Sequence, residues 1–103
     1  MKVMYCEVGK DGRIIEIGDD LHAMQNLVGG YIEVVNLRDN RNLLLVCNEE
    51  GMLYGLPVNE VCTRLAGFMI VGNCFICGDD RENADFGSLT EEDIKWLEEQ
   101  INV

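Results

Sequence analysis

The sequence predicts an α+β fold: a strongly curved antiparallel or mixed sheet of about five or six strands, with two principal helices and a barrel-like partial closure as one option. Short β-rich segments alternate with glycine-containing turns, and two segments carry helix-capping signals. The chain has 103 residues, of which 48% are hydrophobic, enough for one core. We therefore expect a single domain spanning residues 1–103.

The first half of the chain contains four strand-like segments and one helix. Residues 2–8 and 13–17 flank a glycine-containing turn, which predicts a hairpin. Asp19 or Asp20 can cap a helix that ends near Val28, and we expect Gly29 or Gly30 to adopt a positive φ at its end. The remaining strands are expected at 31–37 and at 43–47, the latter apolar throughout and so covered on both faces.

The second half is less regular until its last helix. Pro57 predicts a bend, and residues 58–65 fit either a short helix or an irregular turn. Residues 68–71 and 74–77 are strand-like, and 78–87 are expected to form an acidic loop. Thr90 and Asp93 have the spacing of a capping box, which predicts the start of the final helix.

The chain is strongly acidic, with a net charge of −11. Residues 79–99 hold nine acidic and two basic residues, a net charge of −7. This balance argues against direct binding of nucleic acid through its phosphates, and favours solubility or a partner with a basic surface. No apolar run reaches the roughly 20 residues of a membrane helix, and the N-terminus does not resemble a signal peptide. We therefore expect a cytoplasmic protein without membrane contact.

Five cysteines, an odd number, predict reduced thiols. Cys74 and Cys77 form a C-x-x-C pair, which elsewhere supplies half a zinc site or a redox dithiol. In a strand, however, positions i and i+3 point to opposite faces, so we expect these thiols to pack in the core. We predict no metal and no cofactor.

Catalytic residue types are scarce. His22 is the only histidine and Ser88 the only serine, and we expect an exposed position for the first and a helix-capping role for the second. Glu49 and Glu50 could form an acid–base pair, although an exposed turn is the simpler interpretation. We predict no catalytic residue and a non-enzymatic protein.

Three phrases carry a resemblance to a known family. They are Gly-Gly-Tyr-Ile-Glu-Val-Val at 29–35, Cys-Asn-Glu-Glu-Gly at 47–51 and Gly-Leu-Pro-Val-Asn at 55–59. Together with residues 70–78 and 88–90, they make the chain similar to domain-of-unknown-function family 3846. The resemblance implies a small accessory protein of a bacterium, phage or mobile element. Some proteins of this kind act against host defence. The family often has a basic residue after Asn59, and here Glu60 follows.

The leading hypothesis is a protein that binds a host protein. It would act either as an anti-defence inhibitor or as an acidic mimic. Its surface is expected at two places. One comprises Gly30, Tyr31, Asn48, Glu49, Glu50, Pro57 and Asn59; the other comprises Glu92, Trp96 and Glu99. Trp96 lies off the apolar stripe of the last helix, so it either covers the edge of the sheet or anchors another chain.

Three alternatives stay open at this point. A small ligand, such as a nucleotide signal, could be sequestered near Tyr31 and Asn59. The protein could be a structural or interaction subunit without a ligand. It could also be an enzyme, although the scarcity of histidine and serine argues against that. At the Trp96 surface, formation of a homo-oligomer competes with binding of a different partner.

Overall fold

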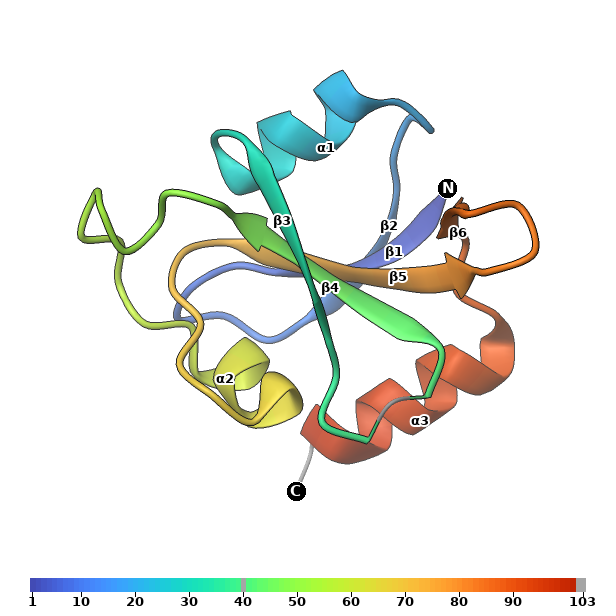
Figure 1. The fold of residues 1–103 in the computed structure, drawn as a ribbon. Coiled ribbons are helices and arrows are strands. Elements are labelled where there is room, and N and C mark those ends of the chain that lie inside the picture. The colour runs from blue at the N-terminus through green and yellow to red at the C-terminus, as the bar shows by residue number, and fades with distance from the viewer. Residues whose placement is uncertain (40, 102–103) are drawn as a thin grey trace.

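The computed structural model describes residues 1–39 and 41–101. In chain order the elements are β1 (Lys2–Cys6), β2 (Arg13–Glu16), α1 (Leu21–Val28), β3 (Ile32–Asn36), β4 (Leu43–Asn48), α2 (Glu60–Ala66), β5 (Cys74–Asp80), β6 (Asp85–Gly87) and α3 (Glu91–Ile101). All strands belong to one antiparallel sheet with the order β2-β1-β5-β4-β3, and β6 pairs with the end of β5. Strands β2 and β3 are therefore its two edges (Figure 1).

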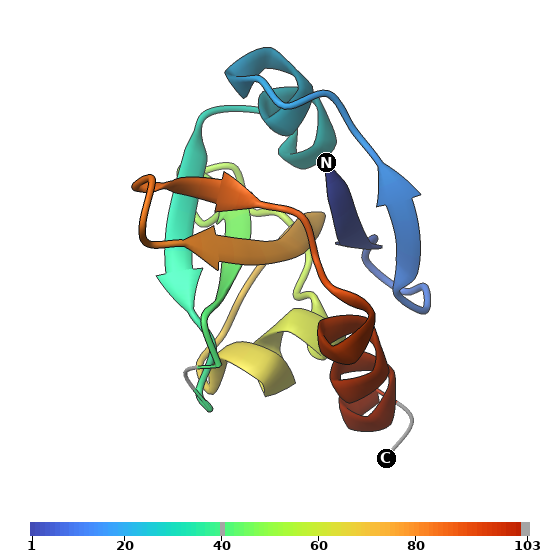
Figure 2. The ribbon, with the colours of Figure 1, turned by 90° about the vertical axis from the view of Figure 1, so that its right-hand side faces the viewer.

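Helices cover both faces of this sheet (Figure 2). The alternation along β5 explains how: Phe75 and Cys77 lie in one apolar cluster with Met24 and Val28 of α1. Cys74 and Ile76 lie in the other cluster, against α2 and α3. Adjacent strand residues point to opposite faces, so a strand that is apolar throughout supplies two cores.

The sheet is open and is neither closed nor strongly curled, so the prediction of strong curvature and partial barrel closure was wrong. The reason is the third helix. Residues 60–66, which the sequence left between helix and turn, form α2 and cover one face together with α3. A sheet covered on both faces buries its apolar side chains without closing on itself. The α+β class is confirmed, and the sheet, predicted as antiparallel or mixed with five or six strands, is antiparallel with six.

Two further segments differ from expectation. Residues 68–71 do not form a strand; only an isolated bridge joins Val58 to Val71. The acidic segment 78–87 is a hairpin and not a loop, because β5 continues to Asp80 and β6 returns from Asp85. The outer end of this hairpin lies in solvent, where charged side chains are tolerated in a strand.

The helix ends follow the predicted chemistry. Asp20 caps α1, and Gly29 ends it with φ 78°, which confirms the predicted positive φ. At α3 the hydroxyl of Thr90 accepts a hydrogen bond from the Asp93 N–H at 3.1 Å. The Asp93 carboxylate accepts in return from the Thr90 N–H at 2.9 Å. The predicted capping box is thus present.

Candidate interaction site

Asn59 is a buried structural residue and not an exposed contact. It is 1% exposed, and its Oδ1 accepts a hydrogen bond from the Cys62 N–H at the start of α2. Its Nδ2 donates to the carbonyls of Cys6 and Gly72, each at 2.9 Å. Because both amide hydrogens are already used, Asn59 has no donor left for a ligand. Glu60 opens α2, where its charge favours the positive end of the helix.

Asn48, the last residue of β4, has a similar structural role. Its Nδ2 donates to the Val28 carbonyl at 3.2 Å, and its Oδ1 accepts from the Glu50 N–H at 2.8 Å. A Cβ atom at position 30 would lie 2.9 Å from this Nδ2, so Gly30 leaves the room that Asn48 needs. Gly30, Asn48 and Glu50 do come together, but they do so to join α1 to the turn after β4.

The bend predicted at Pro57 is hydrogen-bonded to the segment that precedes β5. The Pro57 carbonyl accepts a hydrogen bond from the Gly72 N–H at 2.8 Å, and Leu56 donates to the Gly51 carbonyl at 3.0 Å. Gly72 has φ 80°, and a Cβ there would lie 2.8 Å from the Leu56 side chain. The phrases at 47–51 and 55–59 therefore build one anchored loop.

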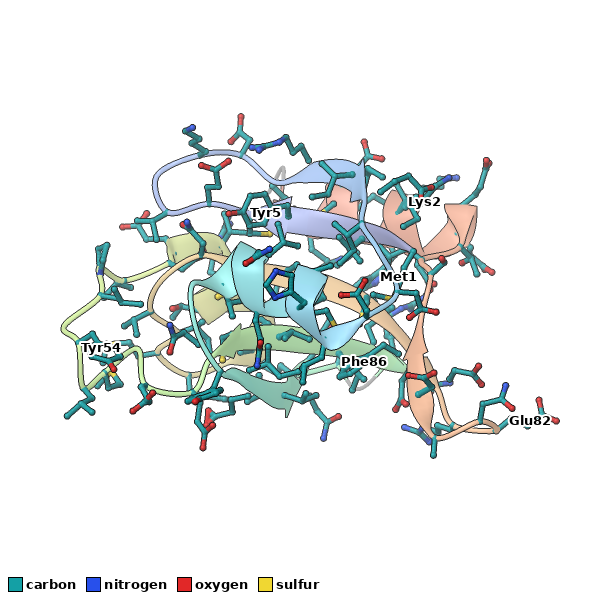
Figure 3. The ribbon with its side chains drawn as sticks, turned by 90° about the horizontal axis from the view of Figure 1, so that it is seen from above. Met1, Lys2, Tyr5, Tyr54, Glu82 and Phe86 are labelled. Atoms are coloured by element: carbon teal, nitrogen blue, oxygen red, sulfur yellow. The ribbon has the colours of Figure 1, made fainter. Side chains whose placement is uncertain are left out.

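This loop presents apolar side chains to solvent. Met52, Leu53 and Tyr54 are 66%, 76% and 65% exposed, and Figure 3 shows Tyr54 at the outer end of the molecule. Phe68 and Met69, which follow α2, are each 52% exposed. We call these five residues the apolar surface. Tyr31 is also exposed, as are Glu49 and Pro57, whereas Glu50 is half-buried.

A small hollow lies where part of the apolar surface meets β3. Met52, Phe68 and Met69 line it together with Glu33 and Glu49, and its volume is about 80 Å³. No ion pair engages Glu33 or Glu49 within residues 1–39 and 41–101. The hollow thus combines apolar walls with two uncompensated carboxylates. We call it the acidic hollow.

Glu33 and the five residues of the apolar surface were not among the site residues predicted from the sequence. A signal was present, because three consecutive apolar residues between Gly51 and Gly55 are unusual in a turn.

A second depression of about 490 Å³ lies between α1 and the anchored loop. Its polar lining comes from Tyr5, Asn26, Asn48, Tyr54 and Asn73, and no charged side chain contributes. The Tyr5 hydroxyl donates to the Leu27 carbonyl at 3.2 Å, and burial, followed by the nearby Glu7 carboxylate, raises the pKa of Tyr5. Neither Tyr31 nor Asn59 lines this groove. Asn59 lines another depression, of about 780 Å³, together with Lys10 and Arg64, and Tyr31 lines neither of the two.

Trp96 is half-buried and covers the flank of the core. It packs against the cluster that contains Leu97, and the Arg41 guanidinium lies 4.7 Å from its ring centroid. Glu92 and Glu99 are exposed on the same helix. Of the two interpretations of Trp96, the structure favours a residue that covers the sheet over a free anchor.

Cys74 and Cys77 lie in different clusters on opposite faces of the sheet, as predicted. An unexpected group of thiols lies on the α2 face. Cys6 is the register partner of Cys74, and interaction with both thiols, followed by burial, raises the pKa of Cys62. Across the described ranges, no group of three or more His, Cys, Asp and Glu side chains is placed to hold a metal ion.

The single histidine and the single serine lie on different segments, His22 on α1 and Ser88 just after β6. His22 is exposed on α1. The Ser88 hydroxyl accepts a hydrogen bond from the Lys2 N–H at 3.0 Å, so it joins the chain to β1 and does not cap α3.

Comparison with known proteins is informative at the level of the family. No helix among residues 1–39 and 41–101 has the length and apolar character needed to cross a bilayer. No curated protein and no solved structure matches the chain. One family profile, described as domain of unknown function (DUF3846), matches residues 1–102. Since this match covers nearly the whole sequence, the chain belongs to the DUF3846 family.

Proposed function

We propose that this protein is a non-enzymatic binding protein that recognises another protein through its apolar surface. The observation that carries the proposal is the exposure of Met52, Leu53 and Tyr54 on an anchored turn. Contiguous exposed apolar side chains are typical of protein interaction sites, because covering them releases water at a favourable free energy.

The way the turn is held supports this role. Hydrogen bonds accepted by oxygen atoms of Asn48, Gly51 and Pro57 hold the loop at its base, so little conformational entropy is lost when a partner covers its tip. Tyrosine and methionine are both enriched at the centres of interfaces. The family resemblance suggests that the partner is a host protein of a phage or mobile element, and defence components are the leading class.

The test is affinity capture from host lysate, comparing single substitutions of equal chemistry. Leu53→Ser and Met69→Ser should each reduce recovery of the captured protein. Leu21→Ser is the matched control, since Leu21 is 53% exposed at the start of α1, outside the apolar surface. Equal recovery with all three variants, each checked for its native circular dichroism, would remove the proposal.

The groove between α1 and the anchored loop supports a second candidate, the sequestration of a small uncharged ligand. Its tyrosine and asparagine lining offers hydrogen bonds without charge. A nucleotide fits it less well, because phosphate recognition usually employs Arg or Lys, and neither lines the groove. Tyr5→Phe should weaken binding of such a ligand and leave capture of a protein partner unchanged.

A further inference from the structure

β3 offers an unpaired edge with a defined hydrogen-bonding pattern. The Glu49 N–H donates to the Tyr31 carbonyl at 2.8 Å, and the register pairs Glu33 with Cys47 and Val35 with Leu45. In an antiparallel ladder, backbone groups alternate between the neighbour and the outside. The N–H and C=O groups of Ile32, Val34 and Asn36 therefore point away from β4.

Little protects this edge from another strand. β3 has no proline, and Val34 is 41% exposed. Figure 2 shows β3 at one margin of the sheet. No hydrogen bond within residues 1–39 and 41–101 uses the outward backbone groups of Ile32 or Val34. Natural proteins usually shield such edges with charges, prolines or bulges, and β3 has only Glu33.

The acidic hollow lies beside the same strand. Glu33 of β3 forms part of its rim, and Met52, Phe68 and Met69 form its apolar walls. Its volume of about 80 Å³ corresponds to two or three water molecules at about 30 Å³ each. That space suits the aliphatic stem of a long side chain, with its charged end at Glu33 and Glu49.

We propose that an extended segment of a partner protein adds to β3 as a further antiparallel strand and places a Lys or Arg side chain in the acidic hollow. The backbone supplies the pairing, and the hollow selects the basic side chain. The next side chain on the opposite face packs against Val34, so the segment alternates basic and apolar residues. This inference rests on the proposed function and names the chemistry of its partner.

A second copy of this chain fits the edge less well. Each copy carries a net charge of −11, and an antiparallel β3–β3 pair would bring two Glu33 side chains near the same axis. Opposite charge, by contrast, increases the rate of association and selects the partner.

The experiment uses synthetic seven-residue peptides with blocked ends. One alternates valine and lysine, one alternates valine and glutamate, and one repeats the lysine peptide with alternate backbone amides methylated. In ¹H–¹⁵N spectra the lysine peptide should shift the amides of Ile32, Val34 and Asn36 and slow their hydrogen exchange. The glutamate and methylated peptides should do neither, because they lack the charge or the donors.

Two variants locate the site. Val34→Pro removes an outward N–H and no bond to β4, and Glu33→Lys reverses the charge of the hollow; each should weaken binding about tenfold or more. Glu82→Lys, an equal charge change in the β5–β6 hairpin, is the control and should leave binding within about twofold.

Three outcomes would overturn the inference. They are equal binding of the glutamate or methylated peptide, shifts confined to α3, or a dimer of the free protein that Val34→Pro dissociates. A captured protein that depends on Leu53 and Met69 but not on Glu33 would retain the proposed function while removing this inference. If neither the substitutions at Leu53 and Met69 nor the substitution at Glu33 reduced capture, both the proposed function and this inference would be removed.

Discussion

The side-chain amide of Asn59 donates a hydrogen bond to the backbone carbonyl of Cys6 at 2.9 Å, although the residues are 53 positions apart. The same Nδ2 donates to Gly72, so one side chain joins the start of α2, the end of β1 and the approach to β5. A residue in one of the motifs that carry the family resemblance therefore serves the fold.

Asn59→Ala should lower the free energy of unfolding by about 3 kcal/mol, because it removes a helix cap and leaves two buried carbonyls without donors. Asn59→Asp keeps the cap acceptor but not the donors, so it should also destabilise. Urea titration measures both. Asn26→Ala, at an exposed position of α1, is the control and should stay within about 0.5 kcal/mol of the wild type.

Gly29→Val should destabilise by more than about 1 kcal/mol, because φ is 78° and valine rarely adopts that conformation. No atom lies within 4 Å of the added Cβ, so the cost comes from the backbone alone. Gly29→Asn should therefore recover much of the stability. Thermal unfolding of the two variants tests this, and equal melting temperatures would contradict the prediction.

Thr90→Ala should cost about 1 kcal/mol, since it removes the acceptor for the Asp93 N–H. Asp93→Ala should cost less, because its bond to the Thr90 N–H is exposed. An unchanged urea midpoint for Thr90→Ala would mean that the capping box does not stabilise α3.

Trp96→Ala should lower stability by about 2 kcal/mol, because the ring covers the core flank. Arg41→Ala should cost about 0.5 kcal/mol through the lost cation–π contact and should alter the fluorescence of this single tryptophan. A Trp96→Ala variant of full stability that lost a partner would support the competing role as a binding anchor.

The thiols should be unreactive in the native protein and should make it sensitive to alkali. All five cysteines are buried, and burial raises the pKa of both Cys47 and Cys77 to about 12. A raised pKa means that stability is complete below the ordinary thiol value near 9 and falls as pH rises toward 12.

Two measurements test this. A thiol reagent at pH 8 should label none of the cysteines until urea is added, and then all five. The urea midpoint should fall between pH 9 and 12 by less in Cys77→Ala than in the wild type. Rapid labelling of the native protein would show that the cores open readily.

Local chemistry is written in the sequence because it depends on neighbours in the chain. Asp20, Gly29 and the Thr90–Asp93 pair act within a few positions, so the ends of α1 and α3 could be predicted. The period of two along 74–77 likewise placed Cys74 and Cys77 on opposite faces. The motifs that identified the family are likewise short segments that can be recognised in the sequence without the fold.

Tertiary structure alone decided what those phrases do. Asn48 and Asn59 looked like exposed contacts, yet each is buried because its partners come from distant strands and loops. The open sheet followed from α2 covering one face, and the acidic hollow from Phe68 and Met69 meeting Glu33. Burial and exposure depend on which distant segments pack together, and a local sequence pattern does not determine that.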